Sequence, residues 1–357
     1  MPKNSHGHAE KLMFFKEKIS FDDVLLEPKY SEIRSRSEVD LSINLCKGFS
    51  FRIPFIPANM QSIISKQMID RIVERSGLIF MHRFGSTEEQ LKLITKLTDS
   101  WGDKLFNFLG VSIGVKKQDY DNLKFFSELG IKIFCVDIAH LDSAHGLEMV
   151  KYISTNYPKA LLVAGNVATG EAAARAWRAG ADVVKVGIGS GSICSTRIEA
   201  AAGVPQLSAI IDVAEAKRKL EPELGRKIYS ISDGSAREAG DCVKSLCFSD
   251  MVMLGSYFAG AVETPGDEIE INGQRLKPYH GSSTHKDSRV EGVKAAVHSK
   301  GHVGDLITKL YEGVQSGCSY QGARNLEQLK NEPAFIKITG AGLTESRIHD
   351  VIIPLHY

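Results

Sequence analysis

The feature that most constrains the fold of this chain is a regular alternation of short apolar runs with amphipathic segments. The runs are nearly continuous in apolar residues, as expected of strands buried on both faces. Segments of helical period and high charge follow them. Eight such units predict an α/β fold, a (β/α)8 TIM barrel with right-handed crossovers, with a doubly wound open sheet as the alternative. The apolar runs lie at residues 53–58, 78–83, 107–113, 131–138, 161–167, 183–188, 227–233 and 252–257.

One long insertion interrupts this spacing after the eighth apolar run. We expect a single barrel domain over residues 1–357, with a β-hairpin and flap inserted at about 259–301. Within the insertion, residues 269–276 place an Asn-Gly pair between alternating residues, which predicts a hairpin. A long insertion at the catalytic end of a barrel commonly forms a lid. An ordinary surface loop is the alternative.

Charge and cysteine usage exclude several classes of function. The 44 basic and 43 acidic residues leave no broad field that would attract nucleic acid or an anionic membrane. The first residues lack the apolar core of a signal peptide, and no apolar run approaches the roughly 18 residues of a membrane span. The six cysteines show no zinc-type pairing. We therefore expect reduced thiols, a cytoplasmic location and small-molecule ligands.

A glycine-rich stretch around Cys194 is the strongest candidate for chemistry. Residues 183–197 read VVKVGIGSGSICSTR, so a β-branched run leads into glycines and then a cysteine. Glycine permits positive φ and close approach of a ligand. In a barrel, the loops after the strands build the active site. The stretch predicts either a loop that presents Cys194 as a nucleophile or, more simply, a tight strand-to-helix turn in which Cys194 is a small core residue.

Other polar residues follow the predicted strands at the same end of the barrel. Barrels commonly bind phosphate after strands seven and eight. There, Asp233, Gly234, Gly255 and Ser256 offer amides, a hydroxyl and a carboxylate suited to a sugar diol. Two further candidates for proton transfer are Thr196, close to the cysteine, and Glu291 in the insertion. Phosphate, ribose and thiol chemistry together indicate an enzyme that modifies nucleotides.

An ordered set of motifs then resembles the IMP dehydrogenase/GMP reductase family. The motifs are FDDVLLEP, PANMQS, MHRF, VDIAH, AGNVATGEAA, GIGSGSICSTR, GVPQLSAI, SDG, MLGSYFAG, PYHGSS and VEG. The resemblance implies that a cysteine bonds to purine C2 of a nucleoside 5′-monophosphate. In this family the dehydrogenases oxidise IMP to XMP with NAD. The reductases convert GMP to IMP and ammonia with NADPH.

Two absences favour the reductase branch of the family. Only Phe84-Gly85-Ser86 separates the second strand from its helix, so the CBS modules that dehydrogenases typically insert there are missing. The stretch Thr284 to Arg289 has no tyrosine for the Arg-Tyr pair that dehydrogenases use in hydrolysis. The ending ITGAGLTESRIHDVIIP resembles dehydrogenase tails and keeps that activity as an alternative. A purine-nucleotide-binding regulator without turnover is a second alternative, motivated by Leu141-Asp142 and Ser235.

The resemblance also implies a role for individual residues. Cys194 corresponds to the nucleophile, Thr196 and Glu291 to proton-transfer groups, and potassium would be bound by carbonyls of Gly189, Gly191 and Cys194. We expect a homotetramer that binds GMP or IMP together with NADPH, and neither nucleic acid nor membrane. The substrate contacts would be Met60, Ser192, Asp233, Gly234, Gly255, Ser256, Tyr279 and Gly281, and the nicotinamide contacts Ser112, Gly114, Asp137 and Asn166.

Overall fold

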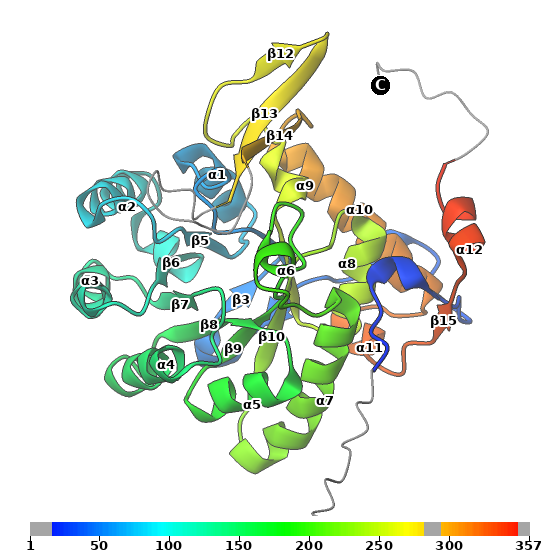
Figure 1. Cartoon of the computed structure of the whole chain (residues 1–357), viewed down its shortest axis with the longest axis horizontal. Coiled ribbons are helices and arrows are strands. Elements are labelled where there is room, and N and C mark those ends of the chain that lie inside the picture. The colour runs from blue at the N-terminus through cyan, green and yellow to red at the C-terminus, as the bar shows by residue number, and fades with distance from the viewer. Residues whose placement is uncertain (1–15, 282–293, 349–357) are drawn as a thin grey trace, which may run out of the picture.

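Eight parallel strands form the centre of the molecule in the computed structural model, which describes residues 16–281 and 294–348 (Figure 1). Hydrogen bonding joins them in the order β4-β11-β10-β9-β8-β7-β6-β5. A parallel bridge between Ile53 and Gly77 joins the two edges just before β4 and β5. The predicted barrel is therefore confirmed. The strands are β4 Phe55–Pro57, β5 Ile79–Met81, β6 Leu109–Ile113, β7 Ile133–Asp137, β8 Leu161–Val167, β9 Val183–Val186, β10 Tyr229–Asp233 and β11 Met251–Leu254.

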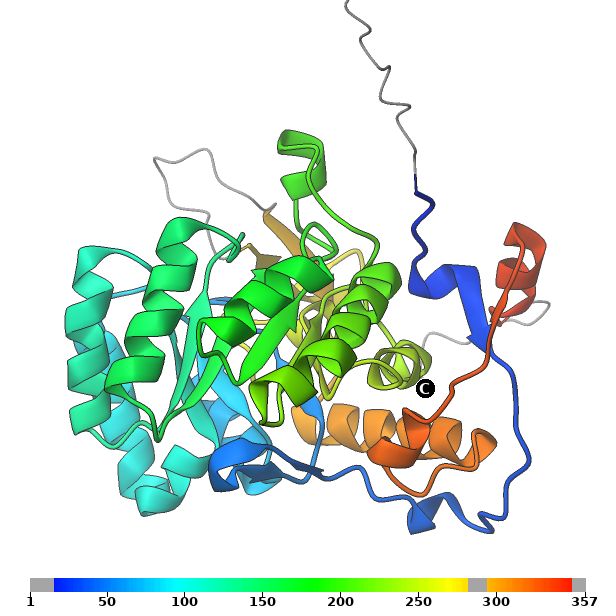
Figure 2. The same ribbon diagram turned by 90° about the horizontal axis from the view of Figure 1, so that it is seen from below.

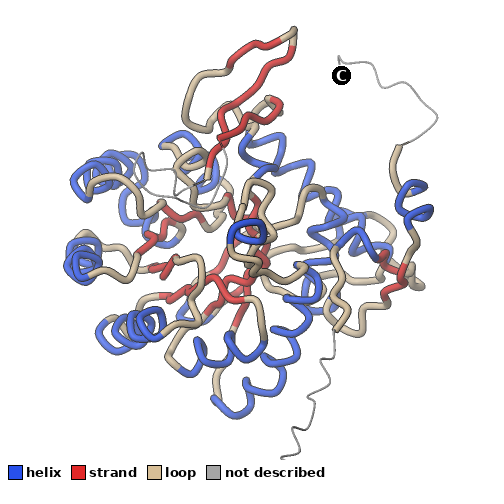
Figure 3. Tube along the Cα trace, in the orientation of Figure 1, coloured by secondary structure: helices blue, strands red, loops and turns tan. Residues whose placement is uncertain are grey.

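Helices surround these strands on the outside of the barrel (Figure 3). Local sequence determines where several begin. The Ser65 hydroxyl accepts a hydrogen bond from the Met68 amide, and Ser86 and Glu89 form a capping box at the next helix. The helices that follow the strands are α1 Lys66–Glu74, α2 Thr87–Trp101, α3 Lys117–Glu128, α4 Ala144–Asn156, α5 Gly170–Arg178, α7 Gln206–Leu224, α8 Ala239–Leu246 and α10 Val303–Tyr320.

The eighth unit carries the insertion that the sequence predicts. The short helix α9 (Ser256–Ala259) follows β11, and β12 (Ile269–Ile271) then pairs with β13 (Gln274–His280). Asn272 and Gly273 both have positive φ, +53° and +74°, as a type I′ turn requires. The hairpin is therefore confirmed. A third strand, β14 (Lys294–His298), pairs with β13 and was not predicted.

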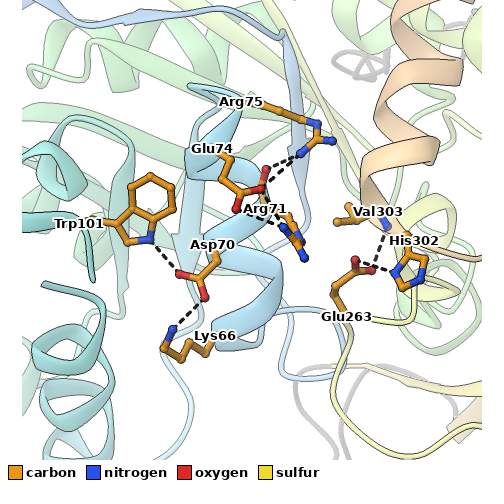
Figure 4. A network of polar contacts seen from close by, with 9 residues as sticks. All are labelled: Lys66, Asp70, Arg71, Glu74, Arg75, Trp101, Glu263, His302 and Val303. Atoms are coloured by element: carbon orange, nitrogen blue, oxygen red, sulfur yellow. Dashed lines mark hydrogen bonds and ion pairs between the residues drawn. The ribbon is translucent and has the colours of Figure 1, made fainter. Parts of the chain in front are cut away.

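Glu263 anchors the base of this insertion to the barrel (Figure 4). Its carboxylate accepts a hydrogen bond of 2.9 Å from the Val303 amide and lies 3.2 Å from Nδ1 of His302, at the beginning of α10. The Ser65 hydroxyl donates to the Glu263 carbonyl at 2.5 Å, which connects the same segment to α1. The segment that leads into the hairpin is thereby fixed to α1 and to the beginning of α10.

Segments from the two ends of the chain pack beside the barrel (Figure 2). β1 (Val24–Leu26) pairs antiparallel with β15 (Phe335–Lys337). The remaining short elements are β2 Ile43–Asn44, β3 Ser50–Phe51, α6 Thr196–Glu199, α11 Leu326–Leu329, α12 Gly340–Glu345 and the 3₁₀ turns Phe21–Asp23, Arg36–Glu38, Cys46–Gly48 and Gly102–Asn107. Across the described ranges, no helix combines the length and apolar character needed to cross a bilayer.

Candidate active site

A cavity of about 550 Å³ opens at the carboxyl ends of β4, β9, β10 and β11. Small-molecule sites commonly enclose about 300–1,000 Å³. The loop that carries Cys194 forms one wall, and the turn after β10 forms the adjacent wall. All eight residues that the sequence predicts as substrate contacts line this cavity: Met60, Ser192, Asp233, Gly234, Gly255, Ser256, Tyr279 and Gly281. The structure therefore brings them together, whereas their individual roles stay predictions.

The cavity also includes residues that were not predicted from the sequence. Ser20, Phe21 and Asp22 reach it from the N-terminal segment. Arg237 lines it from the turn after β10 and forms an ion pair with Asp22. Asp22 and Arg237 are 215 residues apart in the chain. No local pattern indicates such a contact, because it depends on where the first segment packs against the barrel.

Within the cysteine loop, the Sγ of Cys194 lies 3.1 Å from the Oγ1 of Thr196. The Cys194 amide donates to the Gly191 carbonyl at 3.1 Å, which closes a tight turn just before the thiol. Gly189 has φ of +74°, and a Cβ there would lie 2.7 Å from Cγ of Arg197. Glycine is therefore required for this path of the backbone. The half-buried thiol faces the cavity beside a hydroxyl that can exchange a proton with it.

The other five cysteines are poor nucleophiles by comparison. All six are free thiols, and a thiolate is the reactive form. Burial, with the carboxylate of Asp182 nearby, raises the pKa of Cys46 to about 11. Burial raises the pKa of Cys247 and of Cys318 to about 12. Burial also raises the pKa of Cys135 and that of Cys242 far above the usual thiol range.

A buried lysine occupies the barrel interior beneath the cavity. Lys185 on β9 is 2% exposed, and its Nζ lies 2.8 Å from Oδ1 of Asp137 and 3.1 Å from Oδ2 of Asp233. A Cβ on Gly165 would lie 2.5 Å from the Cβ of Lys185, so glycine on β8 leaves room for it. Lys185 was not predicted from the sequence. The available signal was one lysine inside an apolar run, since lysine is almost never fully buried without a partner.

The charges of this cluster stabilise one another. Burial alone would raise the pKa of Asp137, but the ammonium group of Lys185 outweighs that effect and holds the pKa below its usual range. Burial would likewise lower the pKa of Lys185, and the carboxylates of Asp137 and Asp233 raise it instead. Asp137 and Lys185 are therefore both ionised near neutral pH. The Asn166 amide extends the cluster by donating to Asp233 at 2.9 Å.

The four residues predicted to contact the nicotinamide lie outside the lining of the cavity. Ser112 and Gly114 are buried at and just beyond the end of β6, where the Asn59 amide donates to the Ser112 hydroxyl at 2.8 Å. Asp137 and Asn166 lie at the ends of β7 and β8 and belong to the lysine cluster. Glu291 lies outside the described residues. Across those residues, no group of three or more His, Cys, Asp or Glu side chains has the arrangement of a metal site.

The protein is an α/β-barrel, and a cavity large enough for a nucleotide lies at the carboxyl ends of its strands, next to the loop that carries Cys194. This is the position of the active site in barrel enzymes. The family model described as "IMP dehydrogenase / GMP reductase domain" matches residues 18–349. The chain therefore belongs to the IMP dehydrogenase/GMP reductase family, as its motifs predict.

Individual relatives agree with this assignment. The chain is 36% identical over 318 residues to a protein named GMP reductase from Streptococcus pyogenes serotype M49 (strain NZ131), covering 87% of this chain and 92% of that one. A GMP reductase from Streptococcus equi subsp. equi (strain 4047) is also 36% identical, over 317 residues, with the same coverage. Among solved structures, a variant GMP reductase from Trypanosoma brucei in complex with guanosine 5′-monophosphate superposes with a TM-score of 0.85. That structure is 25% identical, and the match covers 95% of this chain and 99% of that chain.

Proposed function

We propose that this protein is a GMP reductase, which uses NADPH to convert GMP to IMP and ammonia. The relatives of 36% identity that carry this name support the proposal. The observation that carries it is the position of Cys194, a half-buried thiol on the wall of a nucleotide-sized cavity with the Thr196 hydroxyl 3.1 Å away. A nucleophile beside a proton-transfer group is the arrangement that covalent catalysis requires.

In the proposed reaction, the sulfur of Cys194 forms a bond to C2 of the purine. The bond from C2 to the exocyclic nitrogen breaks, and that nitrogen leaves as ammonia after it is protonated. NADPH, when bound, supplies the hydride that replaces sulfur at C2. The carbon–sulfur bond then breaks with its electron pair returning to Cys194, and IMP is released. Thr196 exchanges protons near the thiol, and Glu291 is proposed to act on the leaving amine.

The nucleotide is proposed to bind with its phosphate at the turn after β10 and at the beginning of α9. Gly234, Gly255 and Ser256 supply amides and a hydroxyl there, in the position where barrels commonly bind phosphate. Asp233 is suited to the ribose hydroxyls, because its carboxylate accepts hydrogen bonds. Met60 and Tyr279 lie beside each other, with the Tyr279 hydroxyl 4.0 Å from the Met60 sulfur. They would contact the purine, with Ser192 and Gly281 adjacent.

The barrel mouth beyond the cavity has polar groups that fit an extended dinucleotide. The buried Nε of Arg83 has no hydrogen-bond partner among the described residues. Arg83 follows β5, next to the predicted contact Ser112 at the end of β6. A buried donor without a partner is costly, so a ligand with acceptors would satisfy it. Ser112, Gly114, Asp137 and Asn166 would orient the nicotinamide from the neighbouring strands.

A potassium ion is proposed to support the cysteine loop through the carbonyls of Gly189, Gly191 and Cys194. Gly189, one of the proposed ligands, has a left-handed backbone with φ of +74°, so the chain turns there. We also propose a homotetramer. This proposal rests on the resemblance to the family. The six free thiols support a reducing, cytoplasmic location.

The proposal is tested by mixing the purified enzyme with GMP, NADPH and potassium. We expect loss of the reduced-nicotinamide absorbance, release of ammonia in equal amount and formation of IMP. Oxidation of IMP with NAD, without consumption of NADPH in the presence of GMP, would instead identify an IMP dehydrogenase. Tight binding of GMP without turnover would identify a regulator.

A further inference from the structure

Ser235 has a backbone conformation that serine rarely adopts. It follows Gly234 in the turn after β10, lines the cavity, and has φ of +61°. This is the left-handed region, where a Cβ causes steric strain that glycine avoids. A strained residue in a functional loop persists only where its surroundings offset the strain.

The hydroxyl of Ser235 makes a contact that glycine cannot make. Its Oγ donates to the Ser190 carbonyl at 2.9 Å. Ser190 lies in the loop that leads to Cys194, immediately before the turn closed by the Gly191 carbonyl. The hydrogen bond therefore joins the turn proposed to bind phosphate to the loop that carries the nucleophile.

Ser190 is also held from its other side. Its hydroxyl donates to Oε1 of Gln206 at 2.9 Å, and Gln206 is only 1% exposed. The amide of Gln206 donates in turn to the Val186 carbonyl at the end of β9, at 2.6 Å. A Cβ on Gly234 would lie 2.3 Å from the Ser190 hydroxyl, so the two loops are in direct contact. Ser190 is thus fixed to the barrel core through Gln206 and to the phosphate turn through Ser235.

We propose that Ser235 is a positioning residue that couples the phosphate turn to the cysteine loop and so orients Cys194 toward the purine. The inference rests on the proposed function, because it assigns this turn to the nucleotide phosphate. A glycine would keep the backbone path and its amide while removing only the hydroxyl contact. Misplacement of a nucleophile by about 1 Å can cost about 10²-fold in rate. Loss of the hydroxyl therefore acts on turnover rather than on nucleotide binding.

The test compares Ser235→Gly with Ser76→Gly. Ser76 is a matched control, because it also has a left-handed backbone, with φ of +52°, but follows α1. Ser235→Gly relieves the strain of the left-handed backbone, so we expect the variant to fold. We expect it to lower kcat by at least fivefold with KM for GMP within twofold. Ser235→Ala keeps the strained conformation, and we expect the same loss of kcat with a lower Tm.

A second measurement separates this inference from the proposed function, because it needs no substrate. Cys194 is alkylated with iodoacetamide in the ligand-free protein, and the modified peptide is quantified by mass spectrometry. We expect Ser235→Gly to react several-fold faster than the wild type, because its cysteine loop has lost a tether. Ser76→Gly should react at the wild-type rate. A wild-type alkylation rate in Ser235→Gly overturns the inference, even where GMP is not the substrate.

Discussion

The ammonium group of Lys185, a residue only 2% exposed, lies 2.8 Å from the carboxylate of Asp137. The contact joins β9 to β7, and the second carboxylate, Asp233, belongs to β10. Asp137 is a proposed nicotinamide contact, and Asp233 is a proposed ribose contact. The lysine therefore links the ends of β7 and β10, whose carboxylates are proposed to contact the two reactants.

Replacing Lys185 with methionine should destabilise the protein strongly. The change leaves two carboxylates near the barrel centre without their cation, and removal of one partner from a buried ion cluster commonly costs about 3–5 kcal/mol. The free energy of unfolding from urea titration measures the effect. Lys92→Met is the control, because Lys92 pairs with Glu88 where their side chains are 69% and 77% exposed. We expect that variant to lose less than about 1 kcal/mol. Equal losses in the two variants would contradict the argument.

A second buried cluster should make stability depend on pH. Burial alone would raise the pKa of Asp250, but Lys217 and Lys330 outweigh it and hold that pKa far below the usual range. In the unfolded chain the pKa of Asp is about 3.9. The cluster therefore stabilises the fold fully above about pH 5, and this contribution is lost as the pH falls toward the folded-state value.

Asp250→Asn is the variant that tests this dependence. It should be less stable than the wild type at pH 7, because two partly buried lysines lose their partner. The difference should shrink as the pH is lowered through 4, because the carboxyl of the unfolded wild-type chain is then protonated and the stabilisation from the ionised Asp250 decreases. Urea unfolding at several pH values measures the difference. A gap of constant size would contradict the prediction, and Glu88→Gln on the exposed face of α2 should follow the wild type throughout.

Sequence periodicity predicted the barrel because each strand and helix is a local pattern. The eight apolar runs overlap β4 to β11, and the Asn-Gly pair marked the turn between β12 and β13. The pairing of β1 with β15 was not predicted, because it joins segments near opposite ends of the chain. β14 was missed for a different reason. Its sequence, KAAVH, has little of the β-branched and aromatic character that marks strands.

The candidate site divides in the same way. Residues that directly follow barrel strands, such as Asp233 and Gly255, could be assigned to one end of the barrel from topology alone. Lys185 could not be assigned a partner, because Asp137 and Asp233 are each 48 residues away in sequence. The hydrogen bond from Ser235 to Ser190 depends on the exact path of two loops. Such contacts are set by three-dimensional packing and leave no local pattern.

Alkylation should identify Cys194 as the reactive thiol. Only Cys194 and Cys46 are partly exposed, and burial raises the pKa of Cys46 to about 11. At pH 8, iodoacetamide should therefore modify Cys194 first, with loss of activity in proportion. Cys194→Ala should abolish turnover while GMP still binds, as isothermal calorimetry would measure. Substantial turnover in Cys194→Ala would exclude the covalent route.

Thr196 should matter for turnover more than for binding. Its hydroxyl lies 3.1 Å from the Cys194 sulfur. Thr196→Val keeps the shape but removes the hydroxyl, and loss of a proton-transfer group commonly costs about 10²-fold or more in rate. We expect kcat to fall by about that factor, with KM for GMP nearly unchanged. Thr196→Ser, which keeps the hydroxyl, should recover most of the rate. Equal activity in Thr196→Val and Thr196→Ser would show that the Thr196 hydroxyl takes no part in proton transfer.

Glu263 should stabilise the base of the insertion through the beginning of α10. Its carboxylate is 8% exposed and accepts the Val303 amide, one of the four that a helix leaves unpaired at its N-terminus. Negative charge there also interacts favourably with the helix dipole. Glu263→Ala should lower the free energy of unfolding by about 1–2 kcal/mol. The adjacent His302→Ala is the matched control, because His302 is 69% exposed and its removal leaves the cap in place. If both variants lose the same stability in urea titration, the cap does not fix the hairpin to the barrel.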